Sequence, residues 1–183
     1  SSYFWYSNTG GSEAWKLATS DQRSRIVSEV KPAFVTVLDA QAVPQDDWAR
    51  EDHLKMKYSG PLYFDWDSQD INKSIRDFQR TLVKLKDEYD LNLDCIRLYA
   101  TGGRGFHMEI PMECFITKPP KDGITQLPYI YREMAIQLAT DTLDLKVYSG
   151  RKGRMWRVCN VQRENGHYKV EISVSEALAM TPE

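Results

Sequence analysis

Two aspartates one residue apart lie at the end of an apolar run (residues 62–67), and their spacing suits metal chemistry. Alternate side chains of an extended strand point the same way, so Asp65 and Asp67 share one face and Phe64 and Trp66 the other. Neighbouring carboxylates repel each other unless a cation or a proton lies between them, and their oxygens suit Mg²⁺ or Mn²⁺. The pair therefore predicts a divalent-metal site. In the alternative, which stays open, the pair only caps the helix that follows.

A glycine-rich turn at residues 101–107 (TGGRGFH) is the second group. Its three glycines allow the backbone to approach a ligand closely and to expose N–H groups. Arg104 adds a planar fork of donors that matches phosphate oxygens, and His107 follows the last glycine, Gly105, by two residues. The turn indicates a phosphate-binding loop. A plain hairpin with a packed histidine is the alternative.

The third group is the pair Leu143-Asp144, expected at the end of a helix, together with the basic run that follows it. The cations of this run are Lys146, Arg151, Lys152, Arg154 and Arg157, with no acidic residue among them. By itself a charge run is typical of a solvated face. Near a carboxylate cluster it would instead provide counter-charges for phosphate.

The elements that position these residues follow from apolar periodicity. After the acid pair, a helix is predicted from apolar residues at steps of three and four. These residues are Ile71, Ile75, Phe78, Leu82, Leu85 and Tyr89. Strands are expected over residues 94–100 and 106–110, on either side of the glycine turn. Pro128 suits the first turn of a helix over residues 129–143, which would end beside Asp144.

Further elements are expected towards both ends of the chain. A short helix is predicted over residues 21–30 before Lys31-Pro32, and a strand over residues 33–38. Residues 155–161 and 168–174 predict two strands of a hairpin, because Asn165-Gly166 is a strong turn signal. Strands and helices are mixed along the sequence without strict alternation, which favours an α+β domain of two layers.

Composition fits one soluble globular domain. The chain has 183 residues, 42% of them hydrophobic and 27% charged, and a formal net charge of −2. The apolar runs are too short for a transmembrane helix, and the first residues do not form a secretory signal. Three scattered cysteines predict neither a disulfide framework nor a zinc site, which favours a cytoplasmic location. The missing initiator Met and the end at Glu183 suggest a fragment of a longer protein.

Taken together, the three groups resemble the motifs of the archaeo-eukaryotic primase superfamily, the primase-polymerases. Its members carry a DxD or DxE with hydrophobic flanks, then a small-x-His, then a hydrophobic-Asp. Here these are Asp65-Trp66-Asp67, Gly105-Phe106-His107 and Leu143-Asp144. The resemblance extends into residues 149–157 and covers roughly residues 61–161. It implies a single catalytic domain over 1–183, with an N-terminal α/β extension (1–60) and an RRM-like catalytic part (61–175).

The resemblance implies template-directed nucleotidyl transfer by a DNA primase-polymerase. Asp65, Asp67 and Asp144 would be catalytic ligands of two Mg²⁺ or Mn²⁺ ions. By the same resemblance the nucleotide would contact Arg104, Gly105, His107, Arg154 and Arg157, with Arg151 and Lys152 as further candidates. Implied partners are DNA template and primer and an NTP or dNTP. A helicase or accessory priming domain could belong to the full-length protein, and no membrane is implied.

Two other functions stay open. Paired carboxylates and basic residues also serve metal-dependent nucleases. A catalytically silent RRM-like module that binds nucleic acid is the second alternative, although such a module usually presents aromatic residues on its sheet. Aromatic residues do gather at the N-terminus, in Tyr3, Phe4, Trp5, Tyr6 and Trp15. They would either stack on template bases or, as we favour, fold over the core.

Overall fold

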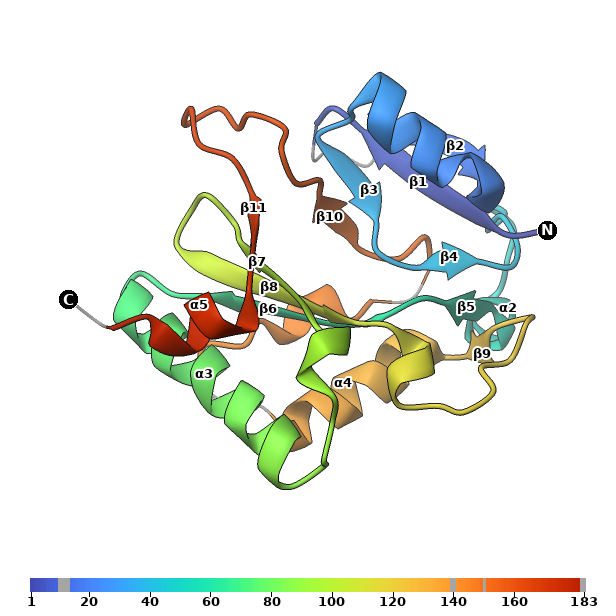
Figure 1. Ribbon diagram of the computed structural model, residues 1–183. Coiled ribbons are helices and arrows are strands. Elements are labelled where there is room, and N and C mark those ends of the chain that lie inside the picture. The colour runs from blue at the N-terminus through green and yellow to red at the C-terminus, as the bar shows by residue number, and fades with distance from the viewer. Residues whose placement is uncertain (10–13, 139–140, 150, 182–183) are drawn as a thin grey trace.

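The computed structural model describes residues 1–9, 14–138, 141–149 and 151–181, and these residues form a mixed α+β fold (Figure 1). The strands are β1 Tyr3–Ser7, β2 Lys16–Thr19, β3 Phe34–Thr36, β4 Asp39–Ala40, β5 Lys57–Ser59, β6 Leu62–Asp67, β7 Arg97–Ala100, β8 Gly105–Ile110, β9 Ile124–Thr125, β10 Met155–Arg157 and β11 Val170–Ile172. The α-helices are α1 Arg23–Arg25, α2 Arg50–Lys55, α3 Ile71–Asp87, α4 Leu127–Leu138 and α5 Val174–Ala179. Shorter helical turns are η2 Ser20–Gln22, η3 Ile26–Val30, η4 Leu93–Cys95, η5 Met112–Cys114 and η6 Leu145–Val147.

The smaller of two antiparallel sheets carries the acid pair, in the order β11-β7-β8-β6. Helices α3 and α4 cover its lower face in Figure 1. The core there is aromatic: Phe78 of α3 stacks on Phe106 of β8 with centroids 4.5 Å apart, and Trp66 of β6 packs against Phe78 at 6.2 Å. This face is therefore filled, which leaves the opposite face of β6 and β8 for the polar residues.

The larger sheet has the order β10-β3-β1-β4-β5-β9, with β2 added beside β1. In Figure 1 its strands β10, β3, β1 and β4 lie above the smaller sheet, and β5 and β9 lie to the right of it. Its two outer strands come from late in the sequence, since β10 pairs with β3 and β9 pairs with β5. Strand β10 also reaches the smaller sheet, because Trp156 stacks on His107 of β8 with centroids 3.8 Å apart. The two sheets therefore meet at His107.

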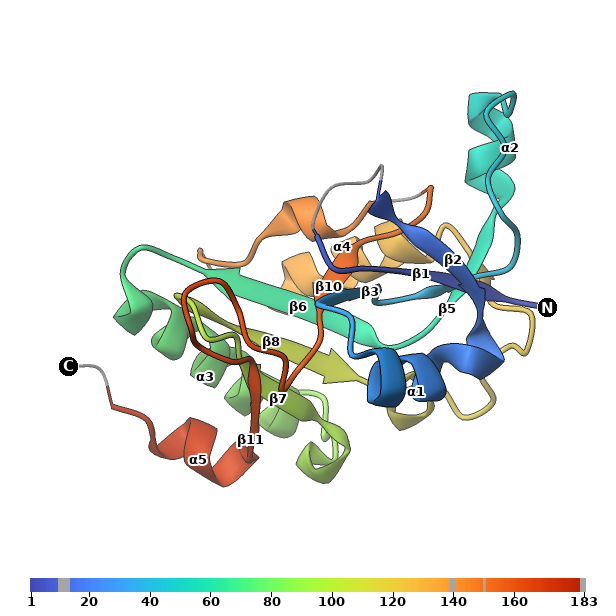
Figure 2. The ribbon, with the colours of Figure 1, turned by 90° about the horizontal axis from the view of Figure 1, so that it is seen from above.

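The N-terminal aromatic residues belong to this sheet. Phe4 and Trp5 of β1 are 0% and 2% exposed, so the expectation that they fold over the core is confirmed. The helix predicted over residues 21–30 is present as η2, α1 and η3, and it ends at Lys31, which has a left-handed φ of 53°. The sequence did not predict the strands β1, β2, β4, β5 and β9 or the helices α2 and α5. Figure 2 shows α2 standing away from both sheets.

The hairpin predicted between residues 155–161 and 168–174 is wrong. Strand β10 pairs with β3 of the larger sheet, whereas β11 pairs with β7 of the smaller one. Between them residues 158–169 form a long arm, which narrows to one isolated pair, Gln162 with Tyr168, around the Asn165-Gly166 turn. The turn was located correctly, but the strands beside it pair with other strands.

Within the described residues, no helix is both long and apolar enough to cross a bilayer.

Candidate active site

Strand β6 presents the acid pair on the face that the helices do not cover. Phe64 and Trp66 are fully buried and stack with centroids 5.2 Å apart on the helix side. The side chain of Asp65 is 16% exposed, and Asp67 at the strand end is exposed. The alternation expected from the sequence is therefore confirmed, and both carboxylates point away from the core.

Asp144 lies beside this pair because its segment adds to the free edge of β6. The Asp144 N–H donates to the Asp65 carbonyl at 2.8 Å, and the Asp67 N–H donates to the Thr142 carbonyl at 3.1 Å. Leu143 lies opposite Trp66 between these two bonds. Residues opposite each other in an antiparallel pair project from one face, so Asp144 emerges on the same side as Asp65.

This placement corrects the expected helix over residues 129–143. Helix α4 runs over Leu127–Leu138, and Leu143 lies in an extended segment, so Asp144 does not end a helix. The apolar Leu143 fitted the helical period, but it packs on the helix side of the sheet, where it is 9% exposed. Asp144 then caps η6, since its Oδ1 accepts from the Lys146 N–H at 2.9 Å.

A buried carboxylate of helix α3 fixes the same segment. Oδ2 of Asp77 accepts from the Thr142 N–H at 2.8 Å and from the Thr142 hydroxyl at 2.6 Å. Asp77 is 7% exposed, so water competes little for these bonds. Sequence reasoning missed this residue, because it treated the polar positions of α3 as its solvent face.

The three carboxylates fit a divalent ion by donor type and by shared face. In the parts of the chain that the structure describes, however, no three Asp, Glu, His or Cys side chains stand close enough together to form a ready metal centre. The Asp144 carboxylate is directed to its own turn by the bond to Lys146. It would have to rotate towards Asp65 to complete a three-carboxylate site.

The glycine turn is tight because it packs against its own chain. A Cβ at Gly105 would lie 1.8 Å from the Trp66 carbonyl oxygen, since Gly105 pairs directly with Asp67. At Gly102, with φ of 77°, a Cβ would lie 2.6 Å from the Tyr168 carbonyl oxygen. Gly105 and Gly102 are therefore required because β6 and the arm (residues 158–169) approach them closely. The glycine pattern by itself had instead indicated the approach of a ligand.

His107 lies opposite Asp65 in the β6–β8 register, and its Nε2 is 3.3 Å from Asp65 Oδ1. Burial lowers the pKa of His107 to about 4; the positive charge of Lys169 adds to this, and the hydrogen bond to Asp65 opposes it. The ring is therefore neutral at pH 7, and its contact with Asp65 is a hydrogen bond. Nδ1 is buried and has no partner in the described part of the chain, so this ring atom remains available as a hydrogen-bond acceptor.

A pocket of about 410 Å³ opens between the two sheets beside these residues. Of the residues expected at the site, its walls include Asp65, Asp67, Arg104, Gly105, His107, Arg154 and Arg157. Arg157 is held by Phe34, whose ring centroid lies 4.5 Å from the guanidinium carbon. Nε of Arg154 is buried and has no partner among the residues that the structure describes. Buried donors are almost always paired, so this one is available to water or to an acceptor on a ligand.

Arg163 and Asn165 of the arm also line the pocket, and sequence reasoning missed both. Arg163 donates to the Thr101 carbonyl at 2.6 Å, and Asn165 donates through its side-chain amide to the Gly102 carbonyl at 3.0 Å. Burial and the nearby Arg163 both lower the pKa of Arg157. Close guanidinium groups repel each other, which favours an anion between them. The available signal was the Asn165-Gly166 turn, which we assigned to the wrong strand pairing.

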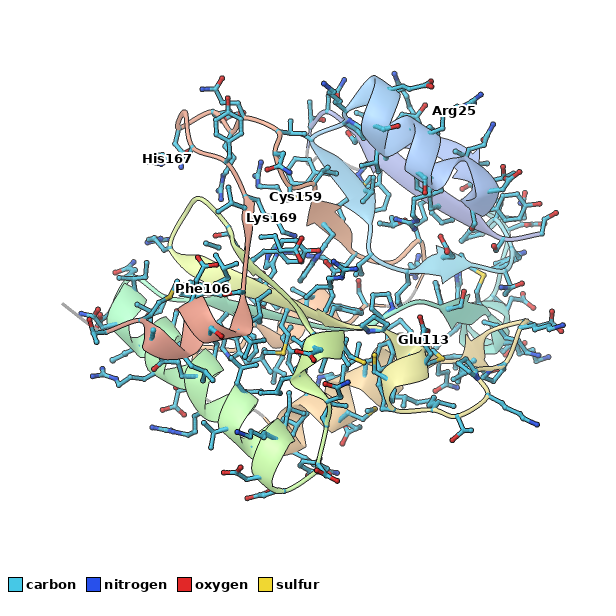
Figure 3. The ribbon with its side chains drawn as sticks, viewed as in Figure 1. Arg25, Phe106, Glu113, Cys159, His167 and Lys169 are labelled. Atoms are coloured by element: carbon cyan, nitrogen blue, oxygen red, sulfur yellow. The ribbon has the colours of Figure 1, made fainter. Side chains whose placement is uncertain are left out.

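Lys169 is a further residue that the sequence did not single out. It is 1% exposed, lies where the arm returns to β11 (Figure 3), and donates from Nζ to the Arg157 carbonyl at 2.9 Å. Its ammonium also lies over Tyr99 and Trp156, at 4.5 and 5.0 Å from their ring centroids. Burial lowers the pKa of Lys169 to about 8. This lysine thus supports the pocket wall from behind.

Arg151 and Lys152 are not brought into this pocket. They line a separate hollow together with Trp15 and Trp48 of the N-terminal part. The basic run therefore divides: its later residues, Arg154 and Arg157, face the acid pair, and its earlier residues face the other hollow.

No protein-family model and no curated protein sequence matches the chain.

Proposed function

We propose that this chain is the RRM-like catalytic core of a primase-polymerase, with an N-terminal α/β extension, and that it joins nucleotides along a template. One observation carries the proposal. Asp65, Asp67 and Asp144 emerge from one face of β6 and its edge segment. Asp65 and Asp67, though not Asp144, line a pocket whose other walls carry arginines. Carboxylates for a cation next to donors for phosphate are what phosphoryl transfer requires.

The pocket residues divide the work of binding a nucleoside triphosphate. Asp65 and Asp67, with Asp144 after rotation, would hold Mg²⁺ or Mn²⁺. Such ions, when bound, supply Lewis-acid activation of the attacking hydroxyl and neutralise the leaving oxygen. Arg104, Arg154 and Arg157 bind phosphate oxygens, with Arg163 added from the arm. His107 orients Asp65 by donating from Nε2, and its unprotonated Nδ1 can accept a hydrogen bond from a hydroxyl group of the nucleotide.

The same chemistry can also cleave a strand, so the direct test must separate lengthening from shortening. A labelled primer annealed to a longer template is incubated with Mn²⁺ and nucleotides. We expect a lengthened primer, no product when EDTA removes the ion, and a loss of at least about a thousandfold in rate for the Asp65→Asn/Asp67→Asn variant. The unchanged circular dichroism of that variant would show that the fold is kept.

A matched pair of substitutions controls for the change in charge. Asp87→Asn and Asp94→Asn remove two exposed carboxylates beyond the pocket walls, at the far end of α3 and in η4. This variant should extend the primer at the wild-type rate. A primer that the wild type shortens would favour the nuclease instead, and full extension by the Asp65→Asn/Asp67→Asn variant would overturn the assignment of these acids.

A further inference from the structure

A second hollow runs beside the pocket and has a different chemistry. Two adjoining cavities of about 520 and 450 Å³ share the residues Arg50, His53 and Arg151, so they form one extended groove. It lies between helix α2 and the segment after η6. Its length across two cavities suits an extended ligand better than a compact one.

Aromatic rings line both ends of this groove. Trp15 and Trp48 line the first cavity, and Tyr129 of α4 lines the second. Trp48 packs edge-on against His53 with centroids 5.3 Å apart, and Tyr129 is 45% exposed. Nε1 of Trp15 and Nδ1 of His53 are buried and have no partner among the described residues. Both atoms are therefore available to hydrogen-bond water or a ligand.

Cations occupy the middle of the groove. Arg50, Arg151 and Lys152 line it against one carboxylate, Asp46. This positive strip contrasts with the chain as a whole, whose formal net charge is −2. Arg151 is held in a left-handed conformation with φ of 88°, and the Tyr58 hydroxyl donates to its carbonyl. A non-glycine residue kept in this conformation indicates a position fixed by its surroundings.

The groove leads to the candidate active site along a continuous stretch of backbone. Arg151 to Gly153 line the groove, and Arg154 to Arg157 line the pocket. Gly153 of the groove and Arg154 of the pocket are therefore consecutive residues, so the two hollows border one short segment of chain.

We propose that the groove binds single-stranded nucleic acid, with bases stacked on Trp48 and Tyr129 and phosphates on Arg50, Arg151 and Lys152. Alternating aromatic and cationic groups match the alternation of base and phosphate along a strand. This inference rests on the proposed function, because it identifies the groove as the path of the template. It also makes a claim of its own, since strand binding requires neither metal nor nucleotide.

The test measures binding of a fluorescein-labelled oligothymidylate of about 15 nucleotides by fluorescence anisotropy, in EDTA and without nucleotide. The variant Arg50→Glu/Lys152→Glu places like charge on the phosphates. Glutamate at position 50 is compatible with the fold, because it begins helix α2, where acidic residues are favoured. We expect a loss of affinity of at least about tenfold and a log–log salt dependence that is shallower by about 1.4.

The control is Arg76→Glu/Arg80→Glu, which changes the net charge equally on the exposed face of α3. It should bind within about twofold of the wild type once the salt concentration screens distant charges. A second pair tests stacking: Trp48→Ala should weaken binding about tenfold, and Trp48→Phe should retain most of the affinity. Equal binding by the wild type and the Arg50→Glu/Lys152→Glu variant would overturn the groove, as would an equal loss in the control.

The outcome separates this inference from the proposed function. Asp65→Asn/Asp67→Asn should bind the oligothymidylate like the wild type, because its substitutions lie outside the groove. A protein that binds through the groove but never extends a primer would refute the polymerase and keep the groove. A protein that extends primers, with Arg50→Glu/Lys152→Glu equal to the wild type in binding and extension, would do the reverse.

Discussion

The cations of the pocket and of the groove come from one stretch of chain, yet those of the pocket lie near acidic residues and those of the groove near aromatic ones. In the pocket, Arg154 and Arg157 stand near Asp65 and Asp67. In the groove, Arg151 and its neighbours stand near tryptophan side chains. Mixed charge suits a ligand that brings its own cation, such as a metal-bound triphosphate, whereas cations with aromatics suit a bare strand. Thus the basic run alone does not define a site; the opposing residues do.

The two regions also differ in how they are built. The pocket floor is made of paired strands, β6 and β8, whose register places Asp65 opposite His107. The groove is bordered by the short helix α2 and by loop segments. Groups on paired strands are held more precisely than groups on loops. We therefore expect the pocket to be sensitive to small changes of its floor and the groove to tolerate them.

The largest expected effect comes from adding one methyl group to the pocket floor. Gly105→Ala would place a Cβ 1.8 Å from the Trp66 carbonyl oxygen, so β6 and β8 would have to separate. We expect this variant to lose about 4 kcal/mol or more of unfolding free energy in urea denaturation. Gly153→Ala is the matched change in the wall of the groove, where no atom of the described residues lies within 4 Å of the added Cβ. It should cost only about 1 kcal/mol, from its left-handed φ of 91°. Equal losses would contradict the difference in rigidity.

Lys169 gives the pocket side a distinctive dependence of stability on pH. Its pKa is about 8 in the folded protein against an ordinary value of 10.5, so the unfolded chain binds more protons between these two pH values. Stability must therefore rise with pH across this range, by up to about 3 kcal/mol, and the cost of burying the charge is fully present below pH 8. Denaturation of wild type and Lys169→Met from pH 7 to 10.5 measures the difference. Parallel curves for the two proteins would show that Lys169 is not a buried, charged group.

A smaller effect is expected from His107, which lines the pocket and lies opposite Asp65. His107→Ala should weaken nucleotide binding by about tenfold or more in calorimetric titration at saturating Mn²⁺, because Nδ1 is lost as a contact. Its packing on Trp156 would also be lost, so the folded state of the variant is checked by near-ultraviolet circular dichroism. Loss of Mn²⁺ affinity with unchanged nucleotide affinity would instead show that His107 acts only through Asp65.

Local patterns predicted the elements on which the site depends. The alternation in β6 and the middle of the apolar stripe of α3, from Ile75 to Leu85, each bury one face. The outer members of the stripe, Ile71 and Tyr89, are exposed. The periodicity of the buried faces is enough to identify both elements. Short strands carry too little pattern for this. Strand β4 has two residues and β5 three, and each is defined by its neighbours in the sheet. The helix expected over residues 129–143 is present as α4, but its expected C-terminal end is wrong, because Leu143 pairs with Trp66 although it fits the helical period.

The sequence predicted the acidic residues of the candidate site, but it did not predict two of the basic residues in and behind the pocket wall. Motif spacing pointed to Asp65, Asp67 and Asp144, which the fold brings to one face. Arg163 and Lys169 gave no such indication, because their positions depend on an arm whose two ends join different sheets. Nor could spacing separate Arg151 from Arg154, which lie three positions apart and line different cavities.

Helix α3 has a consequence for how defects in this protein should be interpreted. Asp77 lines neither the pocket nor the groove, yet its hydrogen bonds to Thr142 hold the segment that carries Asp144. A substitution of Asp77 would free the segment around Thr142 and displace Asp144, while Asp65 and Asp67 would keep their positions in β6. In a survey of random mutants it would imitate the loss of a reacting group, although the damaged residue lies behind the sheet.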